Sequence, residues 1–300
     1  MKPRLLLKRE KKQRVNFYAS DCQKLEADIW LELKGVEPTN PAVYTDSLKW
    51  SAGHGVEAGI CKILKENGHI SETYNQETQE STKITREGIV VSMKFDALTK
   101  ESEMVCDENL LPQTTTLKLK DGEPFEVKSI NNKNFFDIQK YIDGKPKENY
   151  VMQLSIYQDA LSKDTGYLFV ASIDGLNAFI FENKKIGEGK YQCGNTIVNI
   201  ADEYKRFAEI NRKFVAGEEP NYFEEIYKLP LEKIDWHLQT KTDISKARNN
   251  QKVIGSAGKW KLDYSPYKKL ILEKQGVAEG YTDEELVTIN ELTKGYTTWK

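Results

Sequence analysis

The sequence lacks any long hydrophobic run. No stretch approaches the ~20 consecutive apolar residues that a membrane-spanning helix requires. The N-terminal segment has only three consecutive leucines, Leu5 to Leu7, which is too few for the core of a secretory signal. We therefore expect a soluble, cytoplasmic protein that has no membrane partner.

Cysteine is scarce as well. The four cysteines, Cys22, Cys61, Cys106 and Cys193, are far apart in the chain, and no Cys-x-x-Cys pair occurs. This spacing argues against a zinc knuckle and against a dithiol redox motif. Together with the lack of a secretory signal, it favours four reduced thiols over a disulfide framework.

The chain also lacks an excess of charge of one sign. Its 44 basic and 46 acidic residues leave a formal net charge of −2, which argues against a broadly basic, histone-like DNA binder. The net charge is still compatible with a nucleic-acid enzyme, because the charges of acidic metal ligands and of a local basic groove cancel in the sum. Seven basic residues do gather within residues 1–14, where they form either a solvated arm or an arm that contacts phosphates.

What the chain does have is the composition of a globular protein. Hydrophobic residues make up 39% and charged residues 30%, enough for a sizeable core beneath a well-solvated surface. Its 300 residues suit one large domain or a core with an appendage. We expect a basic arm over residues 1–14, a core over residues 15–230 and an extension over residues 231–300.

Two helices are predicted in the first quarter of the chain. Ser20 matches an N-cap, with Gln23 three residues later as its capping-box partner, and Gly35 supplies a stop after apolar residues at helical spacing. A second helix is predicted over residues 47–67. The glycines within it cost helix stability, which indicates either close backbone approach to another element or a break in the helix: Gly53, Gly55 and Gly59.

Strands dominate the next part of the chain. Residues 89–96 alternate between apolar and polar side chains, the period of a strand. A second strand is predicted over 115–120, and Asp121-Gly122 is a strong turn signal before a third strand over 125–130. The polar residues 99–114 are expected to form the tip of an extended hairpin.

A helix, a hairpin and a further helix follow in the predicted order. The order of elements differs from a regular βαβ repeat and predicts a mixed α/β (α+β) layer structure, with a central mixed β-sheet flanked by helices. The predicted segments are the helix 148–161, the strands 167–173 and 178–181, and the helix 196–215.

Glu126 and Lys128 stand two residues apart on a predicted strand, so their side chains project from the same face. A carboxylate beside an ammonium group suits phosphodiester cleavage: the carboxylate holds a divalent ion and the lysine orients or deprotonates the attacking water. The alternative is an exposed charge pair, because Glu-x-Lys occurs by chance in many surface strands.

Asp96 favours the functional interpretation of that pair. It follows a strand of mostly apolar alternate residues, where a carboxylate is costly unless it is exposed or partnered. Oxygen ligands from two neighbouring strands would make a site for Mg²⁺ or Mn²⁺. The alternative is a solvent-facing aspartate at a strand end.

Two helices add further candidates. His54 and Glu57 are three residues apart and share a helix face, so the imidazole would add a metal ligand. The alternative is that His54 is a packed or capping histidine. Gln153 and Tyr157 are four apart on the predicted helix 148–161. They would hold a phosphate or position the lysine, or they are a polar residue beside a buried aromatic one.

Each motif is weak by itself, and their order along the chain makes the match to a known family specific. The sequence resembles the RecB-type branch of the PD-(D/E)XK nuclease superfamily over residues 15–215. That branch includes the nuclease domains of RecB and AddB and the CRISPR-associated exonucleases with an iron–sulfur cluster. The matching motifs are Phe17-Tyr18-Ala19-Ser20-Asp21-Cys22, Gly53-His54, Lys94-Phe95-Asp96-Ala97-Leu98, Phe125-Glu126-Val127-Lys128-Ser129 and residues 153–161, which begin Gln153-Leu154-Ser155-Ile156-Tyr157.

The resemblance implies a restriction-endonuclease-like core and a role for each motif residue. The implied metal ligands are His54, Asp96, Glu126 and the Val127 carbonyl, and Lys128 would be the catalytic lysine. Gln153 and Tyr157 match the family's Gln-x-x-x-Tyr motif, which supports the active site and contacts DNA. Glu57 is not a fixed family position and is kept as a supporting residue behind the ligands.

The sequence departs from its cluster-bearing relatives near the C-terminus. Those relatives place one cysteine early and three late, whereas no cysteine follows Cys193 here. Residues 260–267 look like the family's Trp-x-Cys-x-Tyr-Cys tail with Leu262 and Ser265 in place of cysteines. Four thiolates cannot be assembled, so we expect no iron–sulfur cluster and read Cys22 as a small buried side chain.

Basic and aromatic residues alternate just after the strand that carries Glu126. As a loop, this segment would stack single-stranded bases and contact phosphates, or its two phenylalanines fill the core. The DNA-binding candidates are Lys133, Phe135, Phe136 and Lys140, followed by Tyr141.

These observations together predict a metal-dependent DNA nuclease. The resemblance favours an exonuclease of recombination, repair or phage DNA processing, acting on single-stranded DNA or duplex ends. An endonuclease or nickase of the same fold and an inactive nucleic-acid-binding protein are the alternatives. A recombination or helicase partner is compatible with either activity.

Overall fold

The computed structural model describes most of the chain, which divides into two compact units. The described residues are 14–40, 43–73, 81–105, 116–130, 135–173, 177–220, 222, 261–262, 264–274, 284, 287 and 291. The first unit comprises Met1–Lys8, Val15–Gln23 and Val43–Arg212, and the second comprises Arg9–Arg14, Lys24–Ala42 and Lys213–Lys300. Residues 24–42 thus group with the C-terminal part, a grouping that the sequence pattern did not predict.

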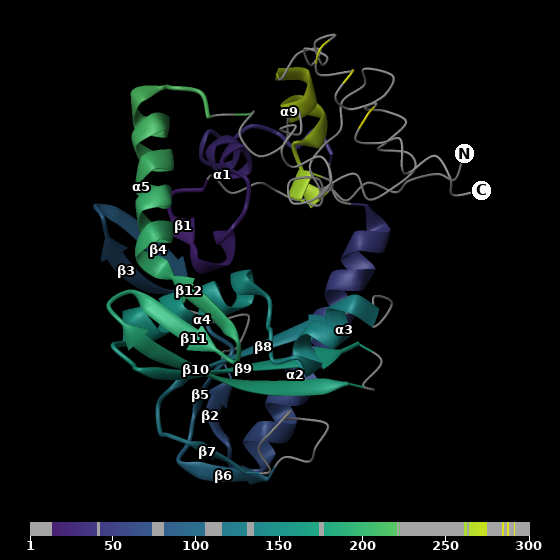
Figure 1. Cartoon of the computed structure of the whole chain (residues 1–300), viewed down its shortest axis with the longest axis vertical. Coiled ribbons are helices and arrows are strands. Elements are labelled where there is room, and N and C mark those ends of the chain that lie inside the picture. Colours follow the sequence, from purple (N-terminus) through teal and green to yellow (C-terminus); the bar gives the residue numbers. More distant parts are fainter. Residues whose placement is uncertain are drawn as a thin grey trace, which may run out of the picture. The chain divides into compact units, whose positions relative to one another are not determined.

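The first unit is built on a seven-stranded sheet in the order β12-β11-β10-β9-β8-β5-β2 (Figure 1). Among the described strands of this sheet, β8 and β9 alone pair in parallel and the other neighbours pair antiparallel, so the sheet is mixed, as predicted. The strands are β2 (Ile70–Thr73), β5 (Ala97–Thr99), β8 (Pro124–Ile130), β9 (Thr165–Ser172), β10 (Ala178–Gly187), β11 (Lys190–Cys193) and β12 (Thr196–Asn199).

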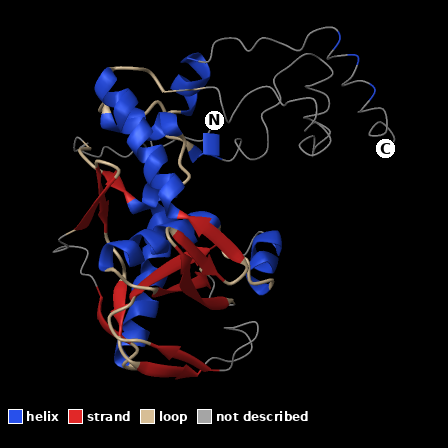
Figure 2. Ribbon diagram, turned by 60° about the vertical axis from the view of Figure 1, so that its left-hand side comes forward, coloured by secondary structure: helices blue, strands red, loops and turns tan. Residues whose placement is uncertain are grey.

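Helices cover both faces of this sheet. Cys61 and Leu64 of α2 (Tyr44–Glu66) share one hydrophobic core cluster with Val127 of β8. Neighbouring residues of a strand point to opposite faces, and Glu126 accordingly meets Gln153 of α4 (Glu148–Leu161). Figure 2 shows the strands in red among the blue helices, and the prediction of a central mixed sheet flanked by helices is confirmed.

A second, three-stranded sheet corrects one predicted strand. It has the order β1-β4-β3, with β1 (Phe17–Tyr18), β3 (Thr82–Arg86) and β4 (Ile89–Met93). The predicted strand 89–96 is therefore wrong in its last residues, because Lys94 to Asp96 carry the chain from β4 into β5 of the central sheet. Periodicity continues through this link because Phe95 is still buried, and periodicity alone does not reveal a change of partner strand.

The hairpin tip predicted over residues 99–114 is wrong in part, because Ser102–Val105 form a strand, β6. It pairs antiparallel with β7 (Thr116–Leu119) in a separate two-stranded sheet. Residues 106–115 lie outside the described part of the chain. The strand prediction 115–120 thus corresponds to β7.

The helix starts show where local signals mislead. Residues Ala19–Asp21 form a short 3-10 helix and α1 (Glu26–Leu33) begins later, with Leu25 at its N-cap. The Ser20 N-cap prediction is wrong, because Gln23 has a φ of 62° and this left-handed backbone interrupts the helix.

The other helices, α2, α4 and α5 (Ile200–Ala216), form in the predicted parts of the chain, with differences at two of their starts. Helix α4 has the predicted bounds, whereas α2 begins before Ser47, where the Asp46 carboxylate accepts a hydrogen bond from the Val43 amide at 3.1 Å. The predicted helix 196–215 is wrong at its start, because 196–199 form β12 before α5 (Ile200–Ala216). Strands β11 and β12 have four residues each, too short for a clear periodic signal.

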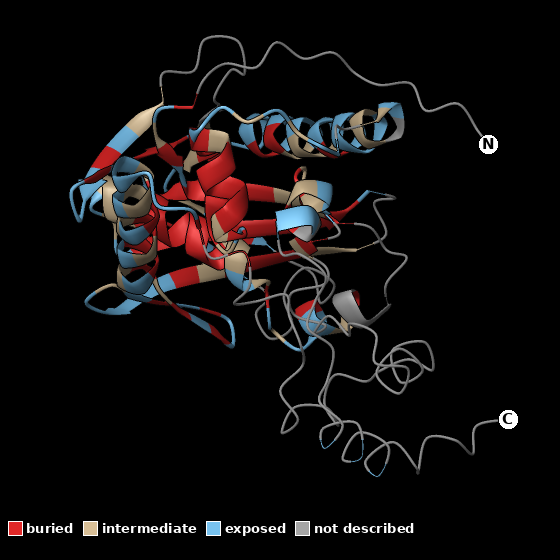
Figure 3. Ribbon diagram, turned by 90° about the horizontal axis from the view of Figure 1, so that it is seen from above, coloured by how far each residue is buried: buried red, intermediate tan, exposed pale blue. Residues whose placement is uncertain are grey.

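Burial concentrates in the central sheet and in α4 (Figure 3). Every residue of α4 from Val151 to Gln158 is buried. Such a helix presents no solvated face along its middle, so its polar side chains require partners within the protein. In the described ranges, no helix combines the length and the apolar character needed to cross a membrane.

In the second unit, residues of the predicted tail pack against α1. The Ser265 hydroxyl donates a hydrogen bond to the buried Asp28 carboxylate, and the Tyr267 hydroxyl donates to the Val36 carbonyl at 3.0 Å. Leu262 and Tyr267 are buried, and α9 (Lys268–Lys274) follows. Ser265 therefore fixes its segment to α1 by a hydrogen bond.

Asp28 makes the stability of the second unit depend on pH. Burial raises the pKa of its carboxyl to about 7, although the hydrogen bond from Ser265 lowers it. The ordinary pKa of an aspartate in an unfolded chain is about 4, so between these values the folded state binds the extra proton. The contribution of Asp28 to the free energy of unfolding therefore falls as the pH rises from about 4 to about 7 and is constant above that window.

We expect Asp28→Asn to raise the melting temperature at pH 8, because the amide removes the buried charge and still accepts the Ser265 hydrogen bond. The gain over the wild type should shrink as the pH falls to 5. Thermal melts followed by circular dichroism at pH 5 to 8 measure the difference between the two proteins, in which other titrating groups cancel. Parallel curves with no narrowing at low pH would contradict the assignment.

Candidate active site

Glu126 is the buried centre of the candidate site. Its side chain is 2% exposed in the middle of β8. Its Oε1 atom accepts a hydrogen bond from Gln153 Nε2 at 2.8 Å and pairs with the Lys128 ammonium group. Its Oε2 atom is buried without a hydrogen-bond partner among the described residues. A buried carboxylate oxygen with no donor is costly, so this atom marks a position suited to a ligand.

Asp96 lies beside Glu126, although the two residues belong to different segments. Its Oδ2 atom accepts a hydrogen bond from the Val127 amide at 2.8 Å, which fixes the link between β4 and β5 against β8. The structure thus shows the Val127 N–H orienting Asp96. The predicted role of the Val127 carbonyl as a ligand stays a prediction.

The two carboxyl groups and the lysine influence one another's titration. Burial and, to a smaller extent, the Asp96 carboxylate raise the pKa of Glu126 to about 8, against the lowering effect of Lys128. Burial also raises the pKa of Asp96, against the lowering effect of Lys128. Burial lowers the pKa of Lys128, but Glu126 and Asp96 outweigh it and hold the pKa above its ordinary value. Lys128 is therefore a cation at neutral pH.

Gln153 and Tyr157 connect the two carboxylate-bearing segments. Gln153 Nε2 donates to Glu126 and to the Tyr157 hydroxyl, and the Tyr157 hydroxyl donates to the Lys94 carbonyl at 2.9 Å. Burial raises the pKa of Tyr157 well above its ordinary value, so the hydroxyl stays protonated and keeps donating. One face of α4 therefore holds both β8 and the segment that leads into Asp96.

Helix α2 carries Glu57 and His54, and the two side chains differ in how much they are buried near Asp96. Glu57 accepts a hydrogen bond from the Ser129 hydroxyl at 3.4 Å, and burial raises the pKa of its carboxyl. His54 is exposed and lies near enough to lower the pKa values of Asp96 and Glu57. In the part of the chain that the structure describes, no three or more His, Cys, Asp or Glu side chains form a group that could hold a metal. Ligation by His54 stays a prediction.

Gly53 explains how α2 approaches β8 so closely. A Cβ atom built at Gly53 would lie 2.7 Å from Ser129 Oγ, whereas one at Gly55 or Gly59 would meet nothing within 4 Å. Of the two alternatives for the glycines in this helix, close backbone approach thus holds at Gly53. The helix itself is continuous through all three positions.

The predicted DNA-binding loop is a helix where the structure describes it. Residues Phe135–Ile142 form α3, which carries Lys140 on its exposed side and Tyr141 fully buried against Phe179, with ring centroids 5.5 Å apart. The loop prediction is therefore wrong for this part, because the aromatic spacing also fits an amphipathic helix. Lys133 and the side chains of Phe135 and Phe136 lie outside the described residues.

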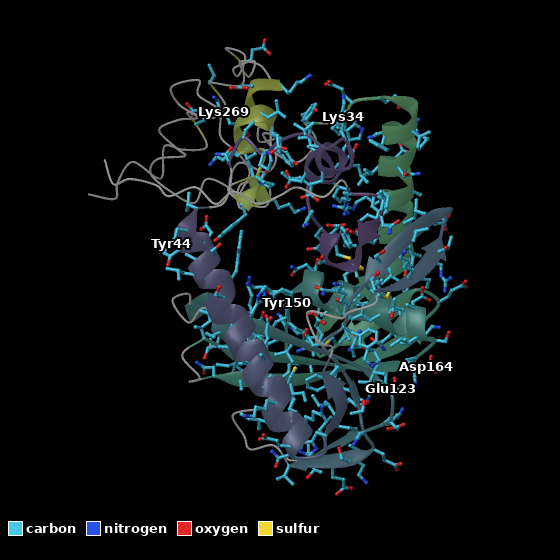
Figure 4. The ribbon with its side chains drawn as sticks, turned by 180° about the vertical axis from the view of Figure 1, so that it is seen from behind. Lys34, Tyr44, Glu123, Tyr150, Asp164 and Lys269 are labelled. Atoms are coloured by element: carbon cyan, nitrogen blue, oxygen red, sulfur yellow. The ribbon has the colours of Figure 1, made fainter. Side chains whose placement is uncertain are left out.

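Tyr150 is a site neighbour that the sequence interpretation missed. Its ring centroid lies 5.7 Å from Lys128 Nζ and 5.9 Å from Lys147 Nζ, and Figure 4 labels its position. It precedes Gln153 by three residues, a spacing that places both on one helix face. That spacing is the signal that could have identified it.

Comparisons with known proteins give loose structural likenesses only. No protein-family model matches the chain, and no curated protein matches it significantly. The solved structure of SSO0001 is similar with a TM-score of 0.36 at 16% identity, over 72% of this chain and 81% of that one. An alkaline exonuclease from Laribacter hongkongensis is similar with a TM-score of 0.39 at 15% identity, over 67% of this chain and 89% of that one.

The same exonuclease in complex with dAMP gives a TM-score of 0.39 at 14% identity, over 67% of this chain and 89% of that one. Scores at this level do not carry an assignment of fold or activity.

We expect Gly53→Ala and Gly55→Ala to change stability in opposite directions. An alanine inside a helix normally stabilises it by about 1 kcal/mol relative to glycine, and Gly55→Ala should show that gain. Gly53→Ala should lower the free energy of unfolding, because its new Cβ would collide with Ser129. Urea unfolding measures both values.

The double variant Gly53→Ala with Ser129→Ala tests the cause. Removing the Ser129 hydroxyl leaves the nearest Ser129 atom 3.8 Å away, an ordinary contact. Measured against the single variant Ser129→Ala, which has already lost the hydrogen bond to Glu57, the double variant should recover the helix gain. Equal stabilisation by Gly53→Ala and Gly55→Ala would show that α2 does not pack this closely on β8.

Proposed function

We propose that this protein is a divalent-metal-dependent nuclease that hydrolyses phosphodiester bonds in DNA, and that its site is the cluster around Glu126. The observation that carries the proposal is the buried Glu126 carboxylate. One of its oxygens is held by Gln153 and Lys128, and the other has no donor among the described residues.

The donor set suits a Mg²⁺ or Mn²⁺ ion. Mg²⁺ binds through one or two carboxylates and keeps several waters and substrate oxygens, so it needs no cage of three or more protein side chains. Asp96 and Glu126 would supply two oxygen ligands. Burial raises the pKa values of both groups by disfavouring their charged forms, and a bound cation would offset that cost. When bound, the ion would supply Lewis-acid polarisation of the phosphate and activation of water.

The protein's own side chains would do the rest of the work. The Lys128 ammonium, fixed by Glu126, would orient the attacking water and offset the negative charge that develops on the phosphate. Gln153 and Tyr157 would keep the carboxylates in register by binding Glu126 and the Lys94 carbonyl. This division of roles matches what the resemblance to the RecB-type branch implies.

An exonuclease of recombination, repair or phage DNA processing is the activity we favour, on the strength of the ordered motifs from residue 17 to residue 161. An endonuclease or nickase would use the same chemistry. Circular plasmid DNA separates the two, because an exonuclease requires an end and leaves a covalently closed circle intact.

We expect Asp96→Asn, Glu126→Gln and Lys128→Met each to lower the rate of DNA cleavage by about a hundredfold or more, the usual effect of removing one electrostatic contributor to a transition state. Release of nucleotides from end-labelled single- and double-stranded DNA with Mg²⁺ or Mn²⁺ measures the rate. Chelation by EDTA should abolish it.

Lys62→Met is the matched control, because this lysine is on α2 and its side chain is 76% exposed, paired with Glu66. It should cleave at the wild-type rate. An inert wild type under all conditions, or unchanged cleavage by Asp96→Asn and Lys128→Met, would overturn the proposed site.

Metal binding can be tested without activity. A ligand that binds only the folded state stabilises it in proportion to the logarithm of its concentration above Kd. Mn²⁺ should therefore raise the melting temperature of the wild type and of Lys62→Met, and it should leave that of the double variant Asp96→Asn, Glu126→Gln nearly unchanged. An equal shift in the double variant would place the ion elsewhere.

A further inference from the structure

Tyr150 shares the α4 face that builds the candidate site, yet it differs from its neighbours in exposure. Tyr150, Gln153 and Tyr157 follow one another at helical spacing. Gln153 is 8% and Tyr157 2% exposed. Gln153 donates a hydrogen bond to Glu126, and the Tyr157 hydroxyl donates to the Lys94 carbonyl. Tyr150 is only half-buried in the first turn of the helix, so part of its ring and its edge can reach a substrate.

Two lysines flank the same ring. Lys128 Nζ lies 5.7 Å and Lys147 Nζ 5.9 Å from the centroid of Tyr150, both within the range of cation–π attraction. Lys147 is the N-cap residue of α4 and is half-buried. Both ammonium groups therefore lie within about 6 Å of one ring, where cation–π attraction offsets part of the repulsion between their charges.

The Tyr150 hydroxyl adds a third donor. Among the described residues it makes no hydrogen bond, in contrast to the Tyr157 hydroxyl seven residues later. The Tyr150 hydroxyl and the Lys147 ammonium group are thus two donors on and beside one ring, whereas Lys128 is already paired with Glu126. A hydroxyl and an ammonium group suit the oxygens of a phosphate, which accept several charge-assisted hydrogen bonds at once.

We propose that Tyr150 and Lys147 form a second phosphate contact, which seats the DNA strand at the phosphate adjoining the one bound by Lys128. This inference rests on the proposed nuclease function and adds substrate-binding residues to it. A phosphate explains the arrangement better than a stacked base, because base stacking needs an open ring face and here ammonium groups lie over the ring.

The test is a binding measurement on the full chain with Asp96→Asn, in the presence of EDTA so that the DNA stays uncleaved. Affinity for a fluorescent single-stranded oligonucleotide is measured over a range of salt concentrations. Adding Lys147→Met should make the slope of log K against log salt shallower by about 0.7, the loss of one phosphate contact on a single strand. Adding Lys62→Met, on the exposed side of α2, should leave both affinity and slope unchanged.

Two tyrosine variants separate the hydroxyl from the ring. Tyr150→Phe keeps the ring and should weaken binding about threefold to tenfold with the slope unchanged, the expected loss for one hydrogen bond. If Tyr150→Phe binds like its parent while Tyr150→Leu binds weakly, the ring stacks on a base and the phosphate proposal is wrong. An unchanged slope in Lys147→Met also overturns it.

The two proposals fail in distinguishable ways. A wild type that neither binds nor cleaves DNA overturns the proposed function, and the Tyr150 contact falls with it. A wild type that cleaves DNA, with Lys147→Met and Tyr150→Phe indistinguishable from their parent in binding, leaves the nuclease proposal standing and removes only the second phosphate contact.

Discussion

The site depends on one costly feature, the burial of the Glu126 carboxylate in the middle of the central sheet. Taking a carboxylate out of water is unfavourable unless it is paired and hydrogen-bonded. Lys128 and Gln153 partner one oxygen, and the other is left without a donor in the described part of the chain. The compensation is therefore incomplete, which is why burial raises the pKa of Glu126 to about 8.

The surrounding elements are arranged so that this carboxylate stays in place. Gln153 and Tyr157 join β8 to the segment before Asp96, and the Val127 amide fixes Asp96 from the other side. Gly53 lets α2 approach Ser129. Helix α4 is buried along its middle, and its polar side chains Gln153 and Tyr157 make the contacts to β8 and to Lys94.

Much of this arrangement could be predicted because it is local. The two-residue spacing of Glu126 and Lys128 on a strand and the four-residue spacing of Gln153 and Tyr157 on a helix determine which side chains share a face. The errors arose where a local signal competed with a tertiary one. The left-handed backbone at Gln23 prevents a helix from starting at Ser20. The apolar–polar alternation of residues 89–96 runs on to Asp96, although the chain has already left β4 and is entering β5 of another sheet.

By itself the sequence determined the mixed architecture, the motif order and the pairing of groups within single elements. Only the tertiary structure decided which groups meet across elements. It set Asp96 against the Val127 amide, Tyr150 beside Lys128, and Ser265 on Asp28. The physical reason is that periodicity records which face of an element is buried, whereas the partner of that face is chosen by the packing of segments far apart in the chain.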